Sequence, residues 1–103
     1  MDSSITRSKE VPVLSVRITD HMLAVDFKDG RSISVPMSWY PRLLHGSSVE
    51  RNNWRIIGRG EGIHWPDLDE DISVRALLEG IPSQENPESL QEWLSNRKQQ
   101  PRS

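Results

Sequence analysis

Cysteine is absent from this sequence of 103 residues. Disulfide bonds, thiolate catalysis and zinc sites with cysteine ligands are therefore excluded. No apolar run approaches the roughly 18–20 residues that a membrane-spanning helix needs. The N-terminal run MDSSITRSKEV also lacks the apolar stretch of a secretory signal. We therefore expect a cytoplasmic protein with no membrane association.

Apolar residues are scarce too, and neither sign of charge dominates. Apolar residues make up 34% of the chain, so the four tryptophans matter, because each can bury a large area. Thirteen basic residues against 15 acidic ones give a net charge of −2. Affinity for nucleic acid comes mainly from clustered Lys and Arg, so this balance argues against a nucleic-acid partner.

Alternating apolar residues near the start of the chain predict a three-stranded antiparallel meander. Asp29 and Gly30 separate its second and third strands, and Asp-Gly is a strong hairpin signal because Gly accepts a positive φ. Asp20 and His21 supply the first turn. The side chains expected to point inward are Leu14, Val16, Ile18, Leu23, Val25, Phe27, Ile33 and Val35.

Two short helices are expected after the meander. Ser38 is placed to cap a helix that starts at Trp39. Ser47 and Glu50 have the spacing of a capping box, in which each side chain accepts a hydrogen bond from the backbone N–H of the other residue. The box predicts a second short helix immediately after Ser47.

A two-stranded hairpin and a third helix follow. Residues 54–58 and 62–65 have the pattern of strands, and the Gly-rich turn between them predicts a hairpin, not a phosphate-binding loop. Ser73 is expected to cap a helix that ends at Gly80. The acidic residues 69–71 precede that helix, where negative charge stabilises the helix N-terminus.

These patterns predict an α+β fold: a small, mainly antiparallel sheet with short helices and a C-terminal amphipathic helix. Residues 1–10 are expected to form a flexible N-terminus, residues 11–80 one globular domain, and residues 81–103 a linker and the final helix. A helix of about 12 residues is marginal alone, so it must dock on its own domain, on a second copy or on a partner.

Three runs of this sequence closely resemble the domain-of-unknown-function 2442 family, over about residues 11–80: DGRSISVPM, WYPRLL and ERNNWRIIGRGEGIHWPDLDEDISVRALLEG. The resemblance implies an α+β fold and no established activity. It also implies a protein partner, because members form gene pairs with the domain-of-unknown-function 4160 family, for which a toxin–antitoxin role has been proposed. Some members carry a C-terminal helix-turn-helix. This chain departs from them, since residues 81–103 supply at most one helix.

His64 and the acidic residues after it form the most concentrated candidate site. The spacing that starts at Asp67 is that of a calcium loop, but Ile72 and Leu78 occupy the positions that require Gly and Glu. No second His lies nearby, so we predict no metal ligand, no catalytic residue and no cofactor. An acid–base pair of His64 with Asp67 or Asp69 is the enzymatic alternative.

The sequence therefore predicts a non-enzymatic protein-interaction module, antitoxin-like or regulatory, whose partner is a neighbouring small protein. A homodimer is left open. The runner-up is a transcriptional regulator that binds nucleic acid through Arg42, Arg51, Arg55 and Arg59. The candidate partner surface consists of His64, Asp67, Asp69, Leu90, Trp93 and Leu94.

Overall fold

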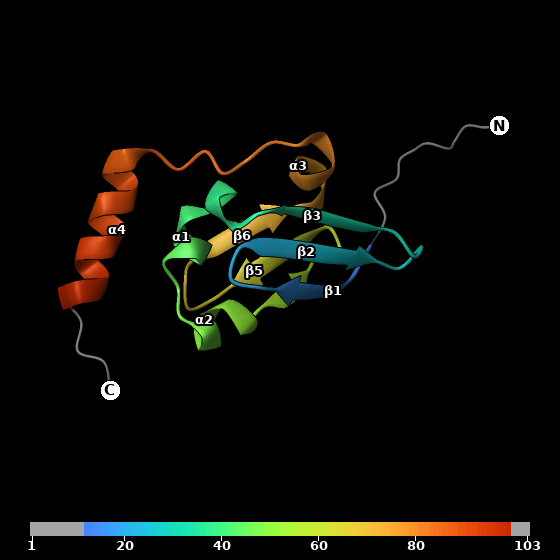
Figure 1. The fold of residues 1–103 in the computed structure, drawn as a ribbon, viewed down its shortest axis with the longest axis horizontal. Helices are drawn as coiled ribbons and strands as arrows, with labels where there is room; N and C mark the ends of the chain where they lie inside the picture. The colour runs from blue at the N-terminus through green and yellow to red at the C-terminus, as the bar shows by residue number, and fades with distance from the viewer. Residues whose placement is uncertain (1–11, 100–103) are drawn as a thin grey trace.

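The computed structural model describes residues 12–99, so the predicted flexible N-terminus, residues 1–10, lies outside the described residues. The fold is α+β, as predicted, and is built on two three-stranded antiparallel sheets with strand orders β1-β2-β3 and β4-β5-β6. Figure 1 shows the first sheet lying in front of the second, with α4 at one end of the molecule. Both sheets contribute to one shared hydrophobic core.

The first sheet is the predicted meander of β1 (Val13–Ile18), β2 (Met22–Phe27) and β3 (Ser32–Pro36). Gly30 has a φ of 95°, as the Asp-Gly turn between β2 and β3 requires. Leu23, Val25 and Phe27, the predicted inward residues of β2, are buried, and Ala24, which was expected on the opposite face, is buried as well.

The expectation for Leu14 was wrong. The pairing of β1 with β2 shifts between Val13 and Ser15, so Leu14 is the extra residue of a β-bulge. Because side chains alternate along a strand, the extra residue reverses the faces on its N-terminal side. Val13 is consequently buried at 1% exposure, and Leu14 is 57% exposed.

The first helical segment also differs from the prediction. Residues Met37–Trp39 form the 3-10 helix η2, and α1 (Pro41–Leu44) begins after Tyr40 with Pro41 in its first turn. Ser38 therefore lies inside η2 and caps no helix. In contrast, the capping box at Ser47 is confirmed: α2 (Ser48–Asn52) begins there, with both reciprocal hydrogen bonds present.

The second sheet contains the predicted hairpin of β4 (Arg55–Ile57) and β5 (Gly62–Trp65), and a further strand, β6 (Glu70–Ser73). Residues 69–71 were expected to precede a helix, and β6 was not predicted. Glu70 and Ile72 are its inward residues, and both are buried. Because one of these two inward residues is a glutamate, the sequence lacks the apolar alternation that is typical of a strand. Ser73 ends β6 and caps α3 (Val74–Glu79) through Ala76 N–H, and Gly80 ends that helix with a φ of 73°.

Trp65 lies at the centre of the core with no exposed surface. Its indole Nε1 donates to the carbonyl oxygen of Arg51 at 2.8 Å, so its one polar group is satisfied. The largest side chains buried with it come from both sheets, from η2 and α1, and from the turn between β5 and β6: Phe27, Leu23, Met37, Leu43, Ile63 and Leu68.

The C-terminal helix α4 (Pro87–Gln99) forms as predicted and rests on its own domain. Trp93 packs against the core cluster, and Arg97 forms an ion pair with Glu50 at 2.8 Å. The segment before the helix is held by Ser83, whose N–H donates to the Trp39 carbonyl oxygen. Within residues 12–99, no helix is long and apolar enough to cross a membrane.

Candidate functional site

His64 does not pair with Asp67 or Asp69. It lies opposite Asp71 in the register of β5 and β6, and its Nδ1 is 2.5 Å from Asp71 Oδ1. Asp71 was not predicted as the partner of His64, because the two residues are paired by β6, which was not expected. Among residues 12–99, no group of three or more His, Asp or Glu side chains could hold a metal ion.

The other acidic residues of the run diverge to separate partners. Asp67 accepts a hydrogen bond from Asn53 Nδ2 at 2.9 Å. Asp69 adopts a φ of 51°, and its carbonyl oxygen accepts from Arg42 Nη1 at 3.0 Å. No hydrogen bond within the described part of the chain joins His64, Asp67 and Asp69 to one another. The structure therefore shows no hydrogen-bonded pair of His64 with Asp67 or Asp69 among the described residues.

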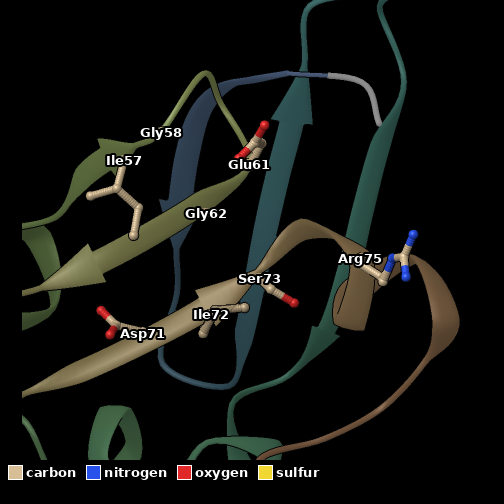
Figure 2. A pocket seen from close by; sticks show the side chains of 8 residues that line it. All are labelled: Ile57, Gly58, Glu61, Gly62, Asp71, Ile72, Ser73 and Arg75. Carbon is tan, nitrogen blue, oxygen red and sulfur yellow. The ribbon is translucent and has the colours of Figure 1, made fainter. Parts of the chain in front are cut away.

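The outer face of the second sheet is open around Gly62. The register places Ile57, Gly62 and Ser73 in one row across the three strands. The Ile57 side chain lies against Gly62, and the row borders a hollow of about 340 Å³ that also takes in Glu61, Asp71 and Arg75. We call this the Gly62 hollow. Figure 2 shows Ile57 reaching from β4 toward β5, with Asp71 on β6.

A second hollow lies where β4 and its turn meet the start of β1. It measures about 540 Å³ and includes Leu14, Lys28, Ile56, Arg59 and Gly60, and we call it the Leu14 hollow. The turn is fixed against β1, because Val13 N–H donates to the Gly60 carbonyl oxygen at 3.2 Å. A Cβ at Gly60 would lie 2.6 Å from Pro12 Cβ, so this position requires Gly. The predicted hairpin turn is thus also the wall of a hollow.

β4 separates the two hollows. Ile56 is 36% exposed and contributes to the Leu14 hollow, and Ile57 is 38% exposed and contributes to the Gly62 hollow. Adjacent residues of a strand point to opposite faces, so apolar surface is uncovered on both faces of this strand. β4 is also the end strand of its sheet.

A buried polar cluster that the sequence did not indicate lies under α1. Glu70 is only 9% exposed, and its burial raises the pKa of its carboxyl to about 7 despite the nearby Arg42 guanidinium. Tyr40 is 3% exposed, and burial, together with the negative charge of Glu70, raises its pKa to about 12. Its hydroxyl has no hydrogen-bond partner among the described residues. The sequence signal that could have indicated this cluster is the pair of alternate residues Glu70 and Ile72, which follows the strand that ends at Trp65.

The predicted apolar anchors of α4 lie against the domain. The Trp93 ring lies between two guanidinium groups, with Arg42 5.1 Å and Arg97 4.7 Å from its centroid. Leu90 and Leu94 are half-buried on the same helix. Arg42 also donates to the carbonyl oxygen of Asp69, so Asp69 and Trp93 of the candidate partner surface share this guanidinium group as a neighbour. That the surface binds a partner stays a prediction.

The four arginines of the runner-up hypothesis have different contacts. Arg42 forms an ion pair with Glu85 at 2.6 Å. Arg51 donates to the carbonyl oxygens of Leu43 and Leu44, which closes the C-terminal end of α1. Arg55 and Arg59 are exposed, on β4 and on the turn that follows it. Two of the four guanidinium groups are therefore occupied by structural contacts.

Comparison with known proteins gives a family and a fold. A search of the curated proteins finds no match. The crystal structure of a protein of unknown function from Rhodospirillum rubrum ATCC 11170 is similar, with a TM-score of 0.65 and 26% identity over 75% of this chain and 95% of the other. Residues 13–83 match the family model described as "Protein of unknown function (DUF2442)". The match confirms the resemblance and covers most of the chain, and the chain belongs to the DUF2442 family.

Proposed function

We propose that this chain is a non-enzymatic protein-interaction module: a regulatory or antitoxin-like partner of a small protein, acting in the cytoplasm. The observation that carries the proposal is β4, an end strand with an exposed isoleucine on each of its two faces. Exposed hydrophobic residues that stand alone are normal on protein surfaces, whereas adjoining ones beside hollows are typical of interaction sites.

The chemistry of β4 supports this proposal. A solvent-exposed strand edge with apolar side chains is a ready template for pairing with another chain, and proteins that do not use such an edge protect it with Pro, a bulge or a charged side chain that points inward. The other sheet has such protection: β1 contains the bulge at Leu14, and β3 ends at Pro36. The pairing of β4 with β5 is regular, and β4 contains no Pro and no bulge. Its only protections are its length of three residues and the charge of the exposed Arg55.

The experiment is co-expression of the tagged full-length chain with each small protein encoded beside it in its native genome. We expect one of these proteins to co-elute with the chain in a fixed ratio on size-exclusion chromatography. If every neighbouring protein elutes separately, the chain is not the partner that we propose.

The His64–Asp71 pair favours a second candidate function, acid–base chemistry on a small molecule held in the Gly62 hollow. A His oriented by a carboxylate is a common general base, and Asp71 belongs to both the pair and the hollow. A fragment screen by NMR tests this candidate. A compound that shifts the Gly62 and Asp71 amides, and no longer does so in His64→Ala, supports it. A screen without such a compound removes it.

A further inference from the structure

We propose that β4 binds an extended segment of a partner protein, which adds a fourth strand to the second sheet and carries a carboxylate between apolar residues. This inference rests on the proposed function, because it specifies what the interaction module recognises. Three features of the structure support it: the free edge of β4, the two hollows beside it, and the charge of one of them.

The edge of β4 has hydrogen-bonding groups available. In an antiparallel ladder, the N–H and C=O of successive residues point alternately toward and away from the neighbouring strand, so a three-residue end strand directs at least one such pair outward. Within residues 12–99, the backbone of β4 bonds only to β5 and to the turn between them. A partner strand can therefore pair with β4 without breaking any described hydrogen bond.

The two hollows match the alternation of an added strand. Its successive side chains point to opposite faces of the sheet. Those on one face lie beside Ile56 and the Leu14 hollow. Those on the other face pack against the exposed Ile57 side chain, which borders the Gly62 hollow. Recognition of this kind takes affinity from main-chain hydrogen bonds and specificity from such alternate pockets.

The positive charge of the Leu14 hollow favours a partner segment that carries a carboxylate. Its charged lining residues are Lys28 and Arg59, both exposed, and neither forms an ion pair within the described part of the chain. A carboxylate on the partner strand complements both cations. A second copy of this chain would bring the same two cations to the contact, so like charges oppose pairing of β4 with itself.

The inference is tested with a synthetic peptide of alternating Val and Glu, acetylated and amidated, which is titrated into the isotope-labelled full-length chain. We expect amide shifts that concentrate on β4, Lys28 and Gly60. A peptide with Lys in place of Glu should bind about tenfold more weakly or worse, because it meets like charges. The Val-Glu peptide with an N-methyl group on every amide should lose binding, because neither of its edges can then donate.

A matched set of variants locates the contact. Lys28→Glu with Arg59→Glu should reverse the preference in favour of the Lys peptide. Val49→Ser removes an exposed apolar side chain from α2 and should leave binding unchanged. Equal binding of the Glu and Lys peptides, or full binding of the N-methylated peptide, would overturn the inference.

Two further outcomes assign β4 to a different occupant and also overturn the inference. Concentration-dependent dimerisation that protects the Ile56 amide would assign the edge to a second copy. Peptide binding that appears only after removal of residues 1–11 would assign it to the chain's own N-terminus. If a neighbouring protein co-elutes with the wild type and equally with the charge-reversed variant, the proposed function stands and this inference fails.

Discussion

Glu70 makes the stability of the protein depend on pH in an unusual direction. Burial raises its pKa to about 7, so the folded state holds this proton more tightly than the unfolded state does. The stabilisation from the protonated carboxyl is complete below the unfolded pKa of roughly 4.3 and is lost as the pH rises through about 7. Most carboxylates act in the opposite direction, as Glu50 does beside Arg97, where the ion pair lowers its pKa.

Glu70→Gln should therefore become relatively more stable as the pH rises. We expect the difference in unfolding free energy between variant and wild type to shift by about 1–3 kcal/mol in favour of Gln between pH 5 and pH 8. Urea unfolding at the two pH values measures this difference. Glu61→Gln, at an exposed position, is the control. A constant difference for Glu70→Gln would show that its carboxyl is not desolvated in the fold.

Trp65 is the residue on which the core depends most. Trp65→Ala should lower the unfolding free energy by about 3–5 kcal/mol, because it leaves a large cavity between the two sheets. Trp65→Phe should cost less than Trp65→Ala, because Phe keeps most of the apolar volume. It should still destabilise the protein, because the Arg51 carbonyl oxygen loses its hydrogen-bond donor. Denaturant unfolding measures both variants. A loss below about 1 kcal/mol for Trp65→Ala would contradict the central position of Trp65.

The bulge in β1 makes a prediction about two adjacent residues. Leu14→Ser should change the unfolding free energy by less than about 0.5 kcal/mol, because Leu14 is exposed. Val13→Ala should cost about 1–3 kcal/mol, because Val13 is fully buried. Thermal unfolding distinguishes the two. A larger loss of unfolding free energy for Leu14→Ser than for Val13→Ala would contradict the bulge and support the uninterrupted alternation predicted from the sequence.

Helix α4 is held to the domain by few contacts. Its 13 residues form a length that is marginal alone, so its order depends on Trp93 and on the Arg97–Glu50 pair. Trp93→Ala should accelerate hydrogen exchange throughout α4 by about tenfold or more and leave β2 and β5 protected. Gln91→Ala, on the exposed face, is the control. Unchanged exchange in α4 would mean that other contacts hold it.

The elements that the sequence predicted are those specified by local signals. The Asp-Gly turn, the capping box at Ser47 and the cap at Ser73 each depend on side chains within a few residues, and all are present. The bulge at Leu14 and the strand β6 depend on pairing with β2 and β5, which are distant in sequence or across a turn. Glu70 disguised β6 further, because its burial depends on the tertiary contacts around Arg42.

The same distinction applies to the candidate site. His64 and the acidic run were predicted as a candidate site from the sequence. Their partners depend on contacts distant in the chain: the register of β6 pairs His64 with Asp71, and Arg42 and Asn53 bind Asp69 and Asp67. The exposure of β4 was not predictable, because residues 54–58 have the same apolar pattern whether the strand lies inside a sheet or at its end. Only the order of the strands in the sheet determines whether β4 is an inner strand or an end strand.

Considered as one molecule, the protein is a small two-sheet domain with one end of the core closed by α4. β4 and its turn join the second sheet to the start of the first, so an added strand would contact both sheets at once. Because two cations border this region, binding of an acidic partner should weaken as the salt concentration rises. Isothermal titration with the identified partner at low and high salt tests this dependence, and a salt-independent affinity would contradict it.

The most direct test of the central claim is a side-by-side co-purification of the co-expressed neighbouring protein with three forms of the full-length chain: wild type, Ile57→Ser and Val49→Ser. Both variants remove an exposed apolar side chain, so circular dichroism should show all three folded alike. We predict that the partner co-elutes with wild type and with Val49→Ser and that its yield falls by about tenfold with Ile57→Ser. Equal recovery with all three forms would contradict the claim that β4 is the interaction surface.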